Sequence, residues 1–527
     1  MIPDKSAQPS LPILPLWFVI LIGAAVLLSG THVLPLLDRD EPRFSRATVE
    51  MMERGDWVIP YFNGEYRFDK PPLTYWWMAI HHKIMGVSEL SCRLHAVEAT
   101  LLIAVWMFIR GRRWVGQVGA SWGTLAWCIN VQIWQHGRLA LADMPMILGL
   151  CLAMDGLWTC LQGEAEEKKM GFWLLLGGLS LGFLAKGPIV IAIPLLAVIA
   201  FLCMKDISWK DLNTTRWLLG VSLFLIVIGS WGIPALIKTQ GLFAKVGLGE
   251  HVVERGVSAF NSRRYTPFFY LGTFFLSFFP WWLKGKSLIG FCRNHFKEKA
   301  VRFLLIWAIA PVIIFTFYST QLPHYILPGF PALFLLLGAA ISSVNVQKSI
   351  PWGTIAASIA LIGLWVFRDK IVDNNFPMEF VPWLAIVLAG FAWFPFLSTR
   401  FHLKGIAVGA VILSVGTWNI SHEFANQHLT LKIREATKVF PDQKLVRQSS
   451  TFGEPSLVFY LGGPWKFGDA IEDSNEGLRV ERISKVEELG LELNGIKVKG
   501  FNPGKGQLEE VMIFPPQPSN AASMSER

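Results

Sequence analysis

Charged residues are scarce in this chain, which excludes an ordinary soluble domain. Only 17% of its 527 residues are Asp, Glu, Lys or Arg, against about a quarter in typical soluble domains. The six cysteines show no spacing typical of a metal site or a disulfide framework. A GxxxxGK[ST] phosphate loop and a dinucleotide-binding fingerprint are also missing, so we expect no nucleotide cofactor.

Long apolar runs are abundant instead. Hydrophobic residues make up 52% of the sequence, and many of the 23 Trp fall near the ends of apolar runs, as in the aromatic belts of membrane proteins. A membrane helix needs roughly 17 to 25 residues, and we count about 13 candidate windows. The prediction is therefore an α-class polytopic membrane bundle whose first run is an uncleaved helix. The windows lie near residues 17–37, 94–109, 114–133, 144–160, 172–185, 188–204, 217–237, 268–283, 303–318, 326–341, 352–367, 381–397 and 406–420.

Basic residues cluster in the short loops between these runs and indicate the topology. The net charge of +9 therefore reports orientation in the membrane, and no nucleic-acid partner is expected. With about 13 crossings and a cytoplasmic N-terminus, the basic loops fall on one side, which the positive-inside rule makes cytoplasmic. The loops 38–91 and 238–267 and the tail after Ser421 are then left outside.

Three regions follow from this pattern. Residues 1–422 form the predicted membrane domain, with outer loops at 38–91 and 238–267. In the first loop, helical spacing over 43–54 and an amphipathic aromatic stretch over 72–85 predict two helices lying in the membrane interface. Residues 423–514 regain charge, and short apolar runs at 456–461 and 510–514 predict strands of a small α/β domain. The Pro- and Ser-rich end, 515–527, is expected to be disordered.

Two dense groups of charge lie in the first outer loop. Asp38-Arg39-Asp40-Glu41-Pro42-Arg43 follows the first apolar run, and Arg67-Phe68-Asp69-Lys70-Pro71-Pro72 comes later. Charges beside a bilayer are costly to place and commonly mark function. A solvated interfacial loop would explain one such charge, but two dense groups favour a functional site.

Further polar residues map to the same outer face, namely Asp143, Lys186, His251, His324 and Tyr325. Some have a purely structural alternative: Asp143 could cap a helix, Lys186 could snorkel, and His251 could be an ordinary loop residue. Their joint placement favours a site in which carboxylates handle protons and cations hold a phosphate. Because a nucleotide-activated substrate is not expected outside the membrane, the sequence points to lipid-phosphate chemistry at the outer leaflet.

A series of short motifs runs in order through about the first 340 residues. They are Asp40-Glu41-Pro42-Arg43-Phe44, Gly55-Asp56-Trp57-Val58-Ile59-Pro60, Asn63-Gly64-Glu65, Phe68-Asp69-Lys70-Pro71-Pro72, Gly137-Arg138 through Asp143-Met144-Pro145, Leu184-Ala185-Lys186-Gly187-Pro188, Glu250-His251 to Arg255, and Pro323-His324-Tyr325-Ile326-Leu327-Pro328. This series resembles the membrane-embedded GT-C glycosyltransferases of the aminoarabinose transferase and protein mannosyltransferase kind. The bacterial aminoarabinose-transferase-like branch, with about 13 helices and a small outer C-terminal domain, is the most similar in layout.

The resemblance implies an inverting transfer of a sugar from a polyprenyl phosphate, undecaprenyl phosphate in bacteria, to an acceptor outside the cytoplasm. It makes Asp40 the base or the acceptor-positioning carboxylate, and Asp143 a second active-site carboxylate. Asp69 and His251 match an acid and a histidine that can share a divalent metal ion, although two protein ligands make an incomplete site. Gln321 stands where the family often has Lys. Contact with the donor phosphate is implied for Lys70, Arg43, Lys186, His324 and Tyr325.

The expected function is that of a glycosyltransferase in the bacterial inner membrane with a periplasmic active site. It would move aminoarabinose, mannose or a similar sugar to lipid A or another envelope acceptor. Protein O-mannosylation is a close alternative because it shares the motifs. A lipid or sugar transporter is an alternative of another class, but transporters place charges near the membrane midplane on interrupted helices. We expect a monomer surrounded by membrane lipids.

Overall fold

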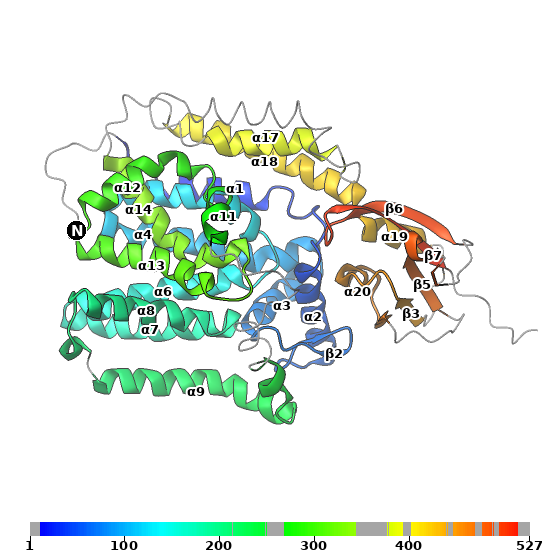
Figure 1. Cartoon of the computed structure of the whole chain (residues 1–527), viewed down its shortest axis with the longest axis horizontal. Helices are drawn as coiled ribbons and strands as arrows, with labels where there is room; N and C mark the ends of the chain where they lie inside the picture. The colour runs from blue at the N-terminus through cyan, green and yellow to red at the C-terminus, as the bar shows by residue number, and fades with distance from the viewer. Residues whose placement is uncertain are drawn as a thin grey trace, which may run out of the picture.

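The computed structural model is a helical bundle with a small sheet domain attached at one end (Figure 1). It describes residues 11–212, 214–247, 249, 268–343, 377, 379–393, 402–438, 440, 446–468, 477–486, 488–489 and 495–514. The predicted span at 352–367, most of the outer loop 238–267 and the tail 515–527 lie outside the described residues.

Apolar helices form the membrane domain. Six helices within the described ranges are long and apolar enough to cross a bilayer, which agrees with the predicted multi-pass membrane protein. The predicted boundary at 422 falls inside the last of them, α18. The helices are α1 (Leu16–Leu28), α4 (Glu89–Cys128), α5 (Val131–His136), α6 (Asp143–Gln162), α7 (Ala165–Lys186), α8 (Ile189–Cys203), α9 (Thr214–Lys238), α11 (Phe269–Ser277), α12 (Gly285–Asn294), α13 (Lys299–Thr316), α14 (Phe330–Ser343), α17 (Phe380–Trp393) and α18 (His402–Gln427), with a 3-10 segment, η5 (Pro323–Gly329), before α14.

The long helix α4 consists of two antiparallel halves. Gly116 has φ 73° and ψ 171°, a conformation that glycine adopts without steric cost and that breaks the helix. A straight helix would separate Thr100 from Trp127 by about 40 Å, yet the Trp127 indole N–H donates to the Thr100 carbonyl at 3.2 Å. The spans predicted at 94–109 and 114–133 are therefore both present, and the chain reverses at Gly116.

The first outer loop folds into two helices and a hairpin. Phe44, Ala47 and Met51 recur at helical spacing on α2 and are buried against Tyr75 of α3, so the pair covers a common apolar core. Gly55, with φ 66°, ends α2 in the left-handed conformation. Both helices agree with the sequence prediction. The elements are α2 (Asp40–Arg54), β1 (Tyr61–Phe62), β2 (Glu65–Tyr66) and α3 (Leu73–Met85).

The C-terminal domain is a five-stranded mixed sheet in the order β4-β3-β5-β7-β6. Strand β3 runs parallel to β4 and β5, whereas β7 runs antiparallel to β5 and β6. Residues from α19 and α20 share one buried core with the sheet, as expected for a small α/β domain. The elements are α19 (Leu429–Thr437), β3 (Val446–Ser449), α20 (Pro455–Leu461), β4 (Trp465–Phe467), β5 (Gly477–Arg482), α21 (Ile483–Val486), β6 (Ile496–Asn502) and β7 (Gln507–Phe514).

One strand prediction in this domain is wrong. The apolar run 456–461 forms the helix α20, whereas the run 510–514 is part of β7 as predicted. A run of this length has no decisive periodicity, so helix and strand cannot be told apart by pattern alone. Pro455 at the first helical position favours the helix, because its fixed φ suits a helix start and its missing N–H is not needed there.

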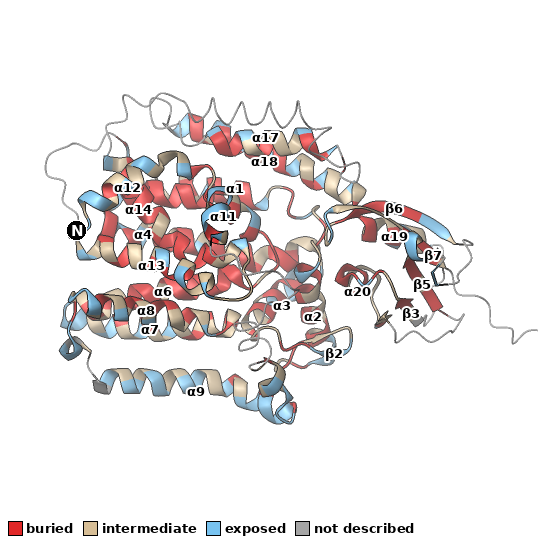
Figure 2. Cartoon of the chain, in the orientation of Figure 1, coloured by how far each residue is buried: buried red, intermediate tan, exposed pale blue. Residues whose placement is uncertain are grey.

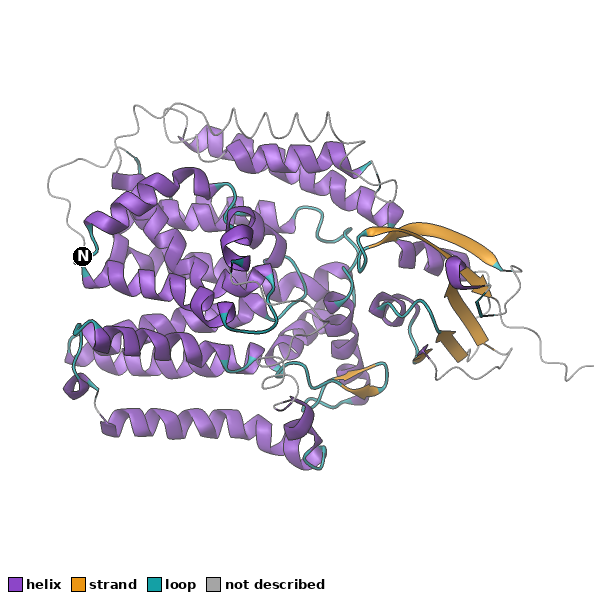
Figure 3. Cartoon of the chain, in the orientation of Figure 1, coloured by secondary structure: helices purple, strands orange, loops and turns teal. Residues whose placement is uncertain are grey.

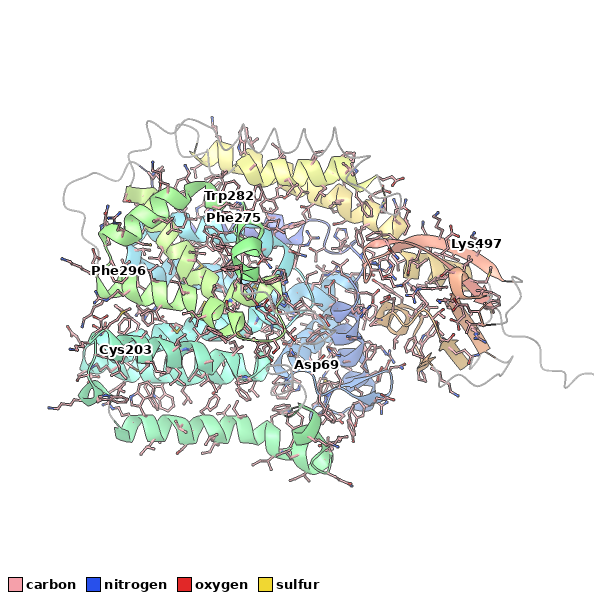
Figure 4. The ribbon with its side chains drawn as sticks, in the orientation of Figure 1. Asp69, Cys203, Phe275, Trp282, Phe296 and Lys497 are labelled. Atoms are coloured by element: carbon pink, nitrogen blue, oxygen red, sulfur yellow. The ribbon has the colours of Figure 1, made fainter. Side chains whose placement is uncertain are left out.

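The two ends of the bundle carry different chemistry. Cys203 and Phe296 lie at the end away from the sheet domain, whereas Asp69 lies at the end next to it (Figure 4). The hairpin β1–β2 and the C-terminal sheet are both at this second end (Figure 3). Between the two ends, the apolar surface of α9 is mostly exposed, with only 11% of its window buried, as expected for a helix that faces lipid (Figure 2).

Candidate functional site

Polar residues at the ends of several helices meet beside the first outer loop. Each lies where a helix begins or ends, so the backbone there leaves the apolar bundle and polar side chains can gather. The positions are Asp40 at the start of α2, Lys70 shortly before α3, His136 at the end of α5, Asp143 at the start of α6, Lys186 at the end of α7, and His324 and Tyr325 in η5.

An ion pair forms the part of the site nearest the bundle. Lys186 Nζ lies 2.5 Å from Asp143 Oδ1, and the side chains are only 17% and 7% exposed. Ala142 occupies the N-cap position of α6 and Asp143 is the first helical residue, so the helix-cap alternative is wrong. Lys186 is held by a carboxylate, so the structure does not support a snorkelling lysine whose only role is to reach the membrane surface.

Two histidines and a tyrosine surround this pair. We call these five residues the bundle group: Asp143, Lys186, His136, His324 and Tyr325. The rings of His136 and His324 lie 4.8 Å apart, and both interact electrostatically with Asp143. Lys186 Nζ lies 5.7 Å from the centre of the Tyr325 ring, a cation–π distance. The bundle group therefore holds a lysine within cation–π distance of a tyrosine in a poorly hydrated place.

A second group of charges comes from the first outer loop, and we call it the loop group: Asp40, Arg43, Arg67 and Asp69. Asp40 is the most accessible of its acids, with 66% of its side chain exposed and Arg43 Nη1 at 4.0 Å. Arg67 Nη2 pairs with Asp69 Oδ2 at 2.9 Å. Burial and the neighbouring Arg67 lower the pKa of Arg43. Two cations are thus held close together, which favours the arrival of an anion.

Lys70 links the two groups. Its Nζ donates to the Asp69 carbonyl at 2.8 Å, and it interacts electrostatically with His324 of the bundle group. Every predicted site residue that the structure describes therefore belongs to one connected set. This set contains four cations and three carboxylates, namely Arg43, Arg67, Lys70 and Lys186, and Asp40, Asp69 and Asp143.

A buried carboxylate next to Asp40 anchors both groups. Glu41 accepts hydrogen bonds from Arg93 at 2.8 and 2.6 Å and from the backbone N–H of Leu37 at 2.8 Å and of Ala140 at 2.7 Å. Ala140 lies three residues before Asp143. One side chain thus joins the start of α2 to the loop that leads into α6, which fixes the backbone on both sides of the site.

The predicted metal site stays a prediction. His251 lies outside the described residues, and within the described ranges no three His, Cys, Asp or Glu side chains are arranged to hold a metal ion. Asp69 Oδ2 is already engaged by Arg67 at 2.9 Å. A cation bound at Asp69 would have to compete with that guanidinium for the carboxylate.

Sequence reasoning assigns no role to His136, Arg67 or the Glu41–Arg93 pair. Arg67 and Glu41 were visible as members of the two charged groups in the first outer loop. Arg93 is an arginine, fully buried, at the start of an otherwise apolar helix, and such a charge needs a partner. His136 carries the weakest signal, because a single histidine at the end of an apolar run is common in structural settings.

A family model described as dolichyl-phosphate-mannose-protein mannosyltransferase matches residues 32–242. An undecaprenyl phosphate-alpha-4-amino-4-deoxy-L-arabinose arabinosyl transferase of Edwardsiella ictaluri is 29% identical over 339 residues, which are 62% of this chain and 60% of that protein. The protein of the same name from Yersinia pestis is 27% identical over 391 residues, 70% of each chain. The chain thus spans between three fifths and seven tenths of these relatives.

Solved structures share the fold. The crystal structure of ArnT from Cupriavidus metallidurans bound to undecaprenyl phosphate superposes with a TM-score of 0.78 at 20% identity, covering 94% of this chain and 97% of that one. The oligosaccharyltransferase of Archaeoglobus fulgidus gives a TM-score of 0.53 at 13% identity, covering 86% of this chain and 64% of that one. Both similarities extend over the helical bundle, well beyond the residues that the family model matches.

Proposed function

Because this chain belongs to the GT-C glycosyltransferases of the aminoarabinose transferase and protein mannosyltransferase kind, we propose that it moves a sugar from an undecaprenyl-phosphate carrier to an envelope acceptor. The carrier is named in the relatives and in a structural neighbour. We propose lipid A or another envelope glycolipid as the acceptor and aminoarabinose as the first sugar to test, since the relatives carry that sugar in their names.

The observation that carries this proposal is the exposed Asp40 beside a group of cations. A sugar phosphate would place its anionic end among Lys70, Lys186 and Arg43, where ammonium and guanidinium groups stabilise the charge that develops on the leaving phosphate. The acceptor oxygen attacks the anomeric carbon from the opposite side, and the bond from that carbon to the phosphate oxygen breaks. Asp40, reachable from outside, then faces the acceptor.

The role of Asp40 depends on the acceptor. If the acceptor is a hydroxyl, the carboxylate takes its proton as the new bond forms. If the acceptor is a phosphate, which is already anionic, no base is needed and Asp40 orients the acceptor or balances positive charge on the sugar ring. Asp143 is engaged by Lys186 at 2.5 Å, so it positions that lysine rather than taking a proton.

The site would face the periplasm of the inner membrane. The support is the position of the first outer loop and the C-terminal domain at one end of the bundle, while Cys203, which begins a basic loop, lies at the other (Figure 4). A carrier whose lipid tail stays in the bilayer would present its phosphate to this end. The transporter alternative is weaker, since the described charges gather at helix ends instead of at the middle of interrupted spans.

Protein O-mannosylation is the second candidate, and one observation favours it. The family model that matches residues 32–242 is named for mannose transfer to protein. The two candidates share the donor side of the site and differ only in what reaches Asp40. The assay uses purified protein in nanodiscs, with undecaprenyl-phosphate aminoarabinose or mannose as the donor and lipid A or a Ser/Thr peptide as the acceptor. The mass of the product distinguishes the two candidate functions.

The decisive comparison in that assay is between the wild type and Asp40→Asn. A second measurement compares mass spectra of lipid A and envelope glycans from cells with and without the gene. Sugar-dependent mass gain in the wild type and not in the variant supports the proposal. Absence of any gene-dependent glycan overturns it.

A divalent metal remains a proposal for the same reaction: activity lost on chelation and restored by added cation supports it, and activity unchanged by chelator overturns it.

A further inference from the structure

The C-terminal domain contacts the membrane domain at the residues that lead into Asp40. Ser456, in the first turn of α20, donates its backbone N–H to Asp38 Oδ1 at 2.9 Å and its hydroxyl to Asp38 Oδ2 at 2.5 Å. These partners are separated by 418 residues. Both carboxylate oxygens of a residue two positions before Asp40 are therefore held by the other domain.

Neighbouring residues of the same short segment are held as well. The Leu36 N–H donates to the Tyr460 hydroxyl at 2.9 Å, and Arg39 Nε lies 3.9 Å from Glu454 Oε2. Ser456 is itself fixed by a hydrogen bond of 2.7 Å to the Thr430 hydroxyl of α19. Residues 36 and 38 are thus hydrogen-bonded to α20 of the C-terminal domain, and Arg39 lies near the residue before that helix.

Asp40 depends on this arrangement because its own side chain is loosely held. Its carboxylate is 66% exposed and its ion pair with Arg43 spans 4.0 Å, a contact that contributes little to order. The place of the carboxylate is therefore set by the backbone on either side. Glu41 fixes the following residue to the membrane domain through Arg93, and Asp38 fixes the preceding segment to the C-terminal domain.

We propose that Asp38 and Ser456 are positioning residues, through which the C-terminal domain holds Asp40 in the geometry needed for sugar transfer. This inference rests on the proposed function, since it assigns the C-terminal domain a part in that reaction. The domain contributes no group to the reacting atoms. It contributes a fixed attachment point for the backbone, and a reacting group displaced by about 1 Å can lose on the order of 100-fold in rate.

The test uses full-length protein in nanodiscs with three variants. Asp38→Ala removes both hydrogen bonds and is expected to lower kcat by about 10- to 100-fold with little change in KM for the carrier. Asp38→Asn keeps the shape: its oxygen can accept from the Ser456 N–H, and its amide can donate to the hydroxyl, so most of the activity is expected to return. Ser456→Ala, in the C-terminal domain, removes only the hydroxyl bond, so its kcat should lie between those of Asp38→Ala and Asp38→Asn.

A matched control comes from the same interface. Asn63 also makes two hydrogen bonds to the C-terminal domain, with Trp465 O at 2.8 Å and Trp465 N at 2.6 Å, but it lies in the turn of the β1–β2 hairpin and not in the segment that leads into Asp40. Asn63→Gly removes them and tolerates the φ of 58° at this position. It is expected to keep kcat within about twofold of the wild type, if the loss is specific to the Asp38 contact.

Hydrogen exchange of residues 36–44 in the same samples reports the geometry without the reaction. Faster exchange there in Asp38→Ala and Ser456→Ala, with recovery in Asp38→Asn, supports the inference together with the kcat pattern. Wild-type kcat in Asp38→Ala, or equal losses in Asp38→Ala and Asn63→Gly, overturns it. A wild-type protein that transfers no sugar from any donor overturns the proposed function instead, so the two failures are distinguishable.

Discussion

The loop group and the bundle group place carboxylates at one end of the molecule in opposite surroundings. Asp40 is 66% exposed, and its pairing with Arg43 is long at 4.0 Å. Asp143 is 7% exposed and is bound to Lys186 at 2.5 Å. An accessible carboxylate can act on an incoming acceptor, whereas a buried one in a tight pair fixes its partner. The difference in exposure and pairing is why the proposed reaction gives Asp40 a role towards the acceptor and Asp143 a role in holding Lys186.

Removing the charge of Asp40 gives the largest expected effect on rate. Asp40→Asn should lower transfer by about 100- to 10,000-fold, while thermal stability stays near that of the wild type because the side chain is mostly exposed. Glu53→Gln is the matched control, since Glu53 is a 55% exposed acid on the same helix that pairs with Arg46 and lies outside the site. Near-normal transfer by Asp40→Asn would move the acceptor role to Asp143.

Breaking the Asp143–Lys186 pair tests the other half of the comparison. Lys186→Met should reduce kcat/KM for the carrier by about 100-fold, since a cation at the leaving phosphate is lost. The double variant Asp143→Asn, Lys186→Met avoids a buried unpaired carboxylate and should be no worse than Lys186→Met alone, as expected for residues that act as one unit. Multiplicative losses in the double variant would show that Asp143 acts separately from Lys186.

The anchoring pair should matter for stability. Glu41→Gln leaves Arg93, which is fully buried, without its counter-charge. Loss of one partner of a buried pair typically costs about 3 to 5 kcal/mol. Thermal unfolding of the purified protein in detergent measures this, with Glu50→Gln as a control, because Glu50 lies on the same helix and binds Arg46 and the hairpin backbone. An unchanged unfolding temperature in Glu41→Gln would contradict the anchoring role.

The loop group was the easier of the two to predict from the sequence. Its members come from two charged stretches of one loop, so their clustering is visible without a structure. Asp143 and Lys186 are 43 residues apart, and their pairing depends on how closely α6 and α7 pack. Side chains at Gly149 or Gly178 would collide with the backbone of the opposite helix, so these glycines allow the close approach. The sequence placed both residues on the outer face but did not show the pairing.

The contact between domains was beyond sequence reasoning for a further reason. Ser456 and Asp38 are far apart in the chain, and no periodicity or motif connects them. The helix that carries Ser456 was also predicted as a strand, because seven residues are too few for a periodic pattern to decide. Local patterns thus revealed elements and charged groups, whereas the pairs that set the geometry of the site are tertiary.

The smallest expected effect concerns pH. Burial raises the pKa of the Asp38 carboxyl from 3.8 to about 7, with Glu454 adding to the rise and the Ser456 hydrogen bonds and Arg43 opposing it. A carboxyl with a raised pKa favours the folded contact while it is protonated. The contact therefore weakens as the pH rises from about 4 to about 7, and it changes little above that.

Asp38→Asn should remove this slope, because an amide does not titrate in this range while it keeps the shape of the protonated acid. The measurement is hydrogen exchange of residues 36–44 in the full-length protein at pH 5, 6, 7 and 8, corrected for the intrinsic pH dependence of exchange. Wild-type protection should fall from pH 5 to pH 7 and change little from pH 7 to pH 8, and protection in Asp38→Asn should stay level throughout. If the variant keeps the wild-type slope, Asp38 is not the titrating group and the prediction is wrong.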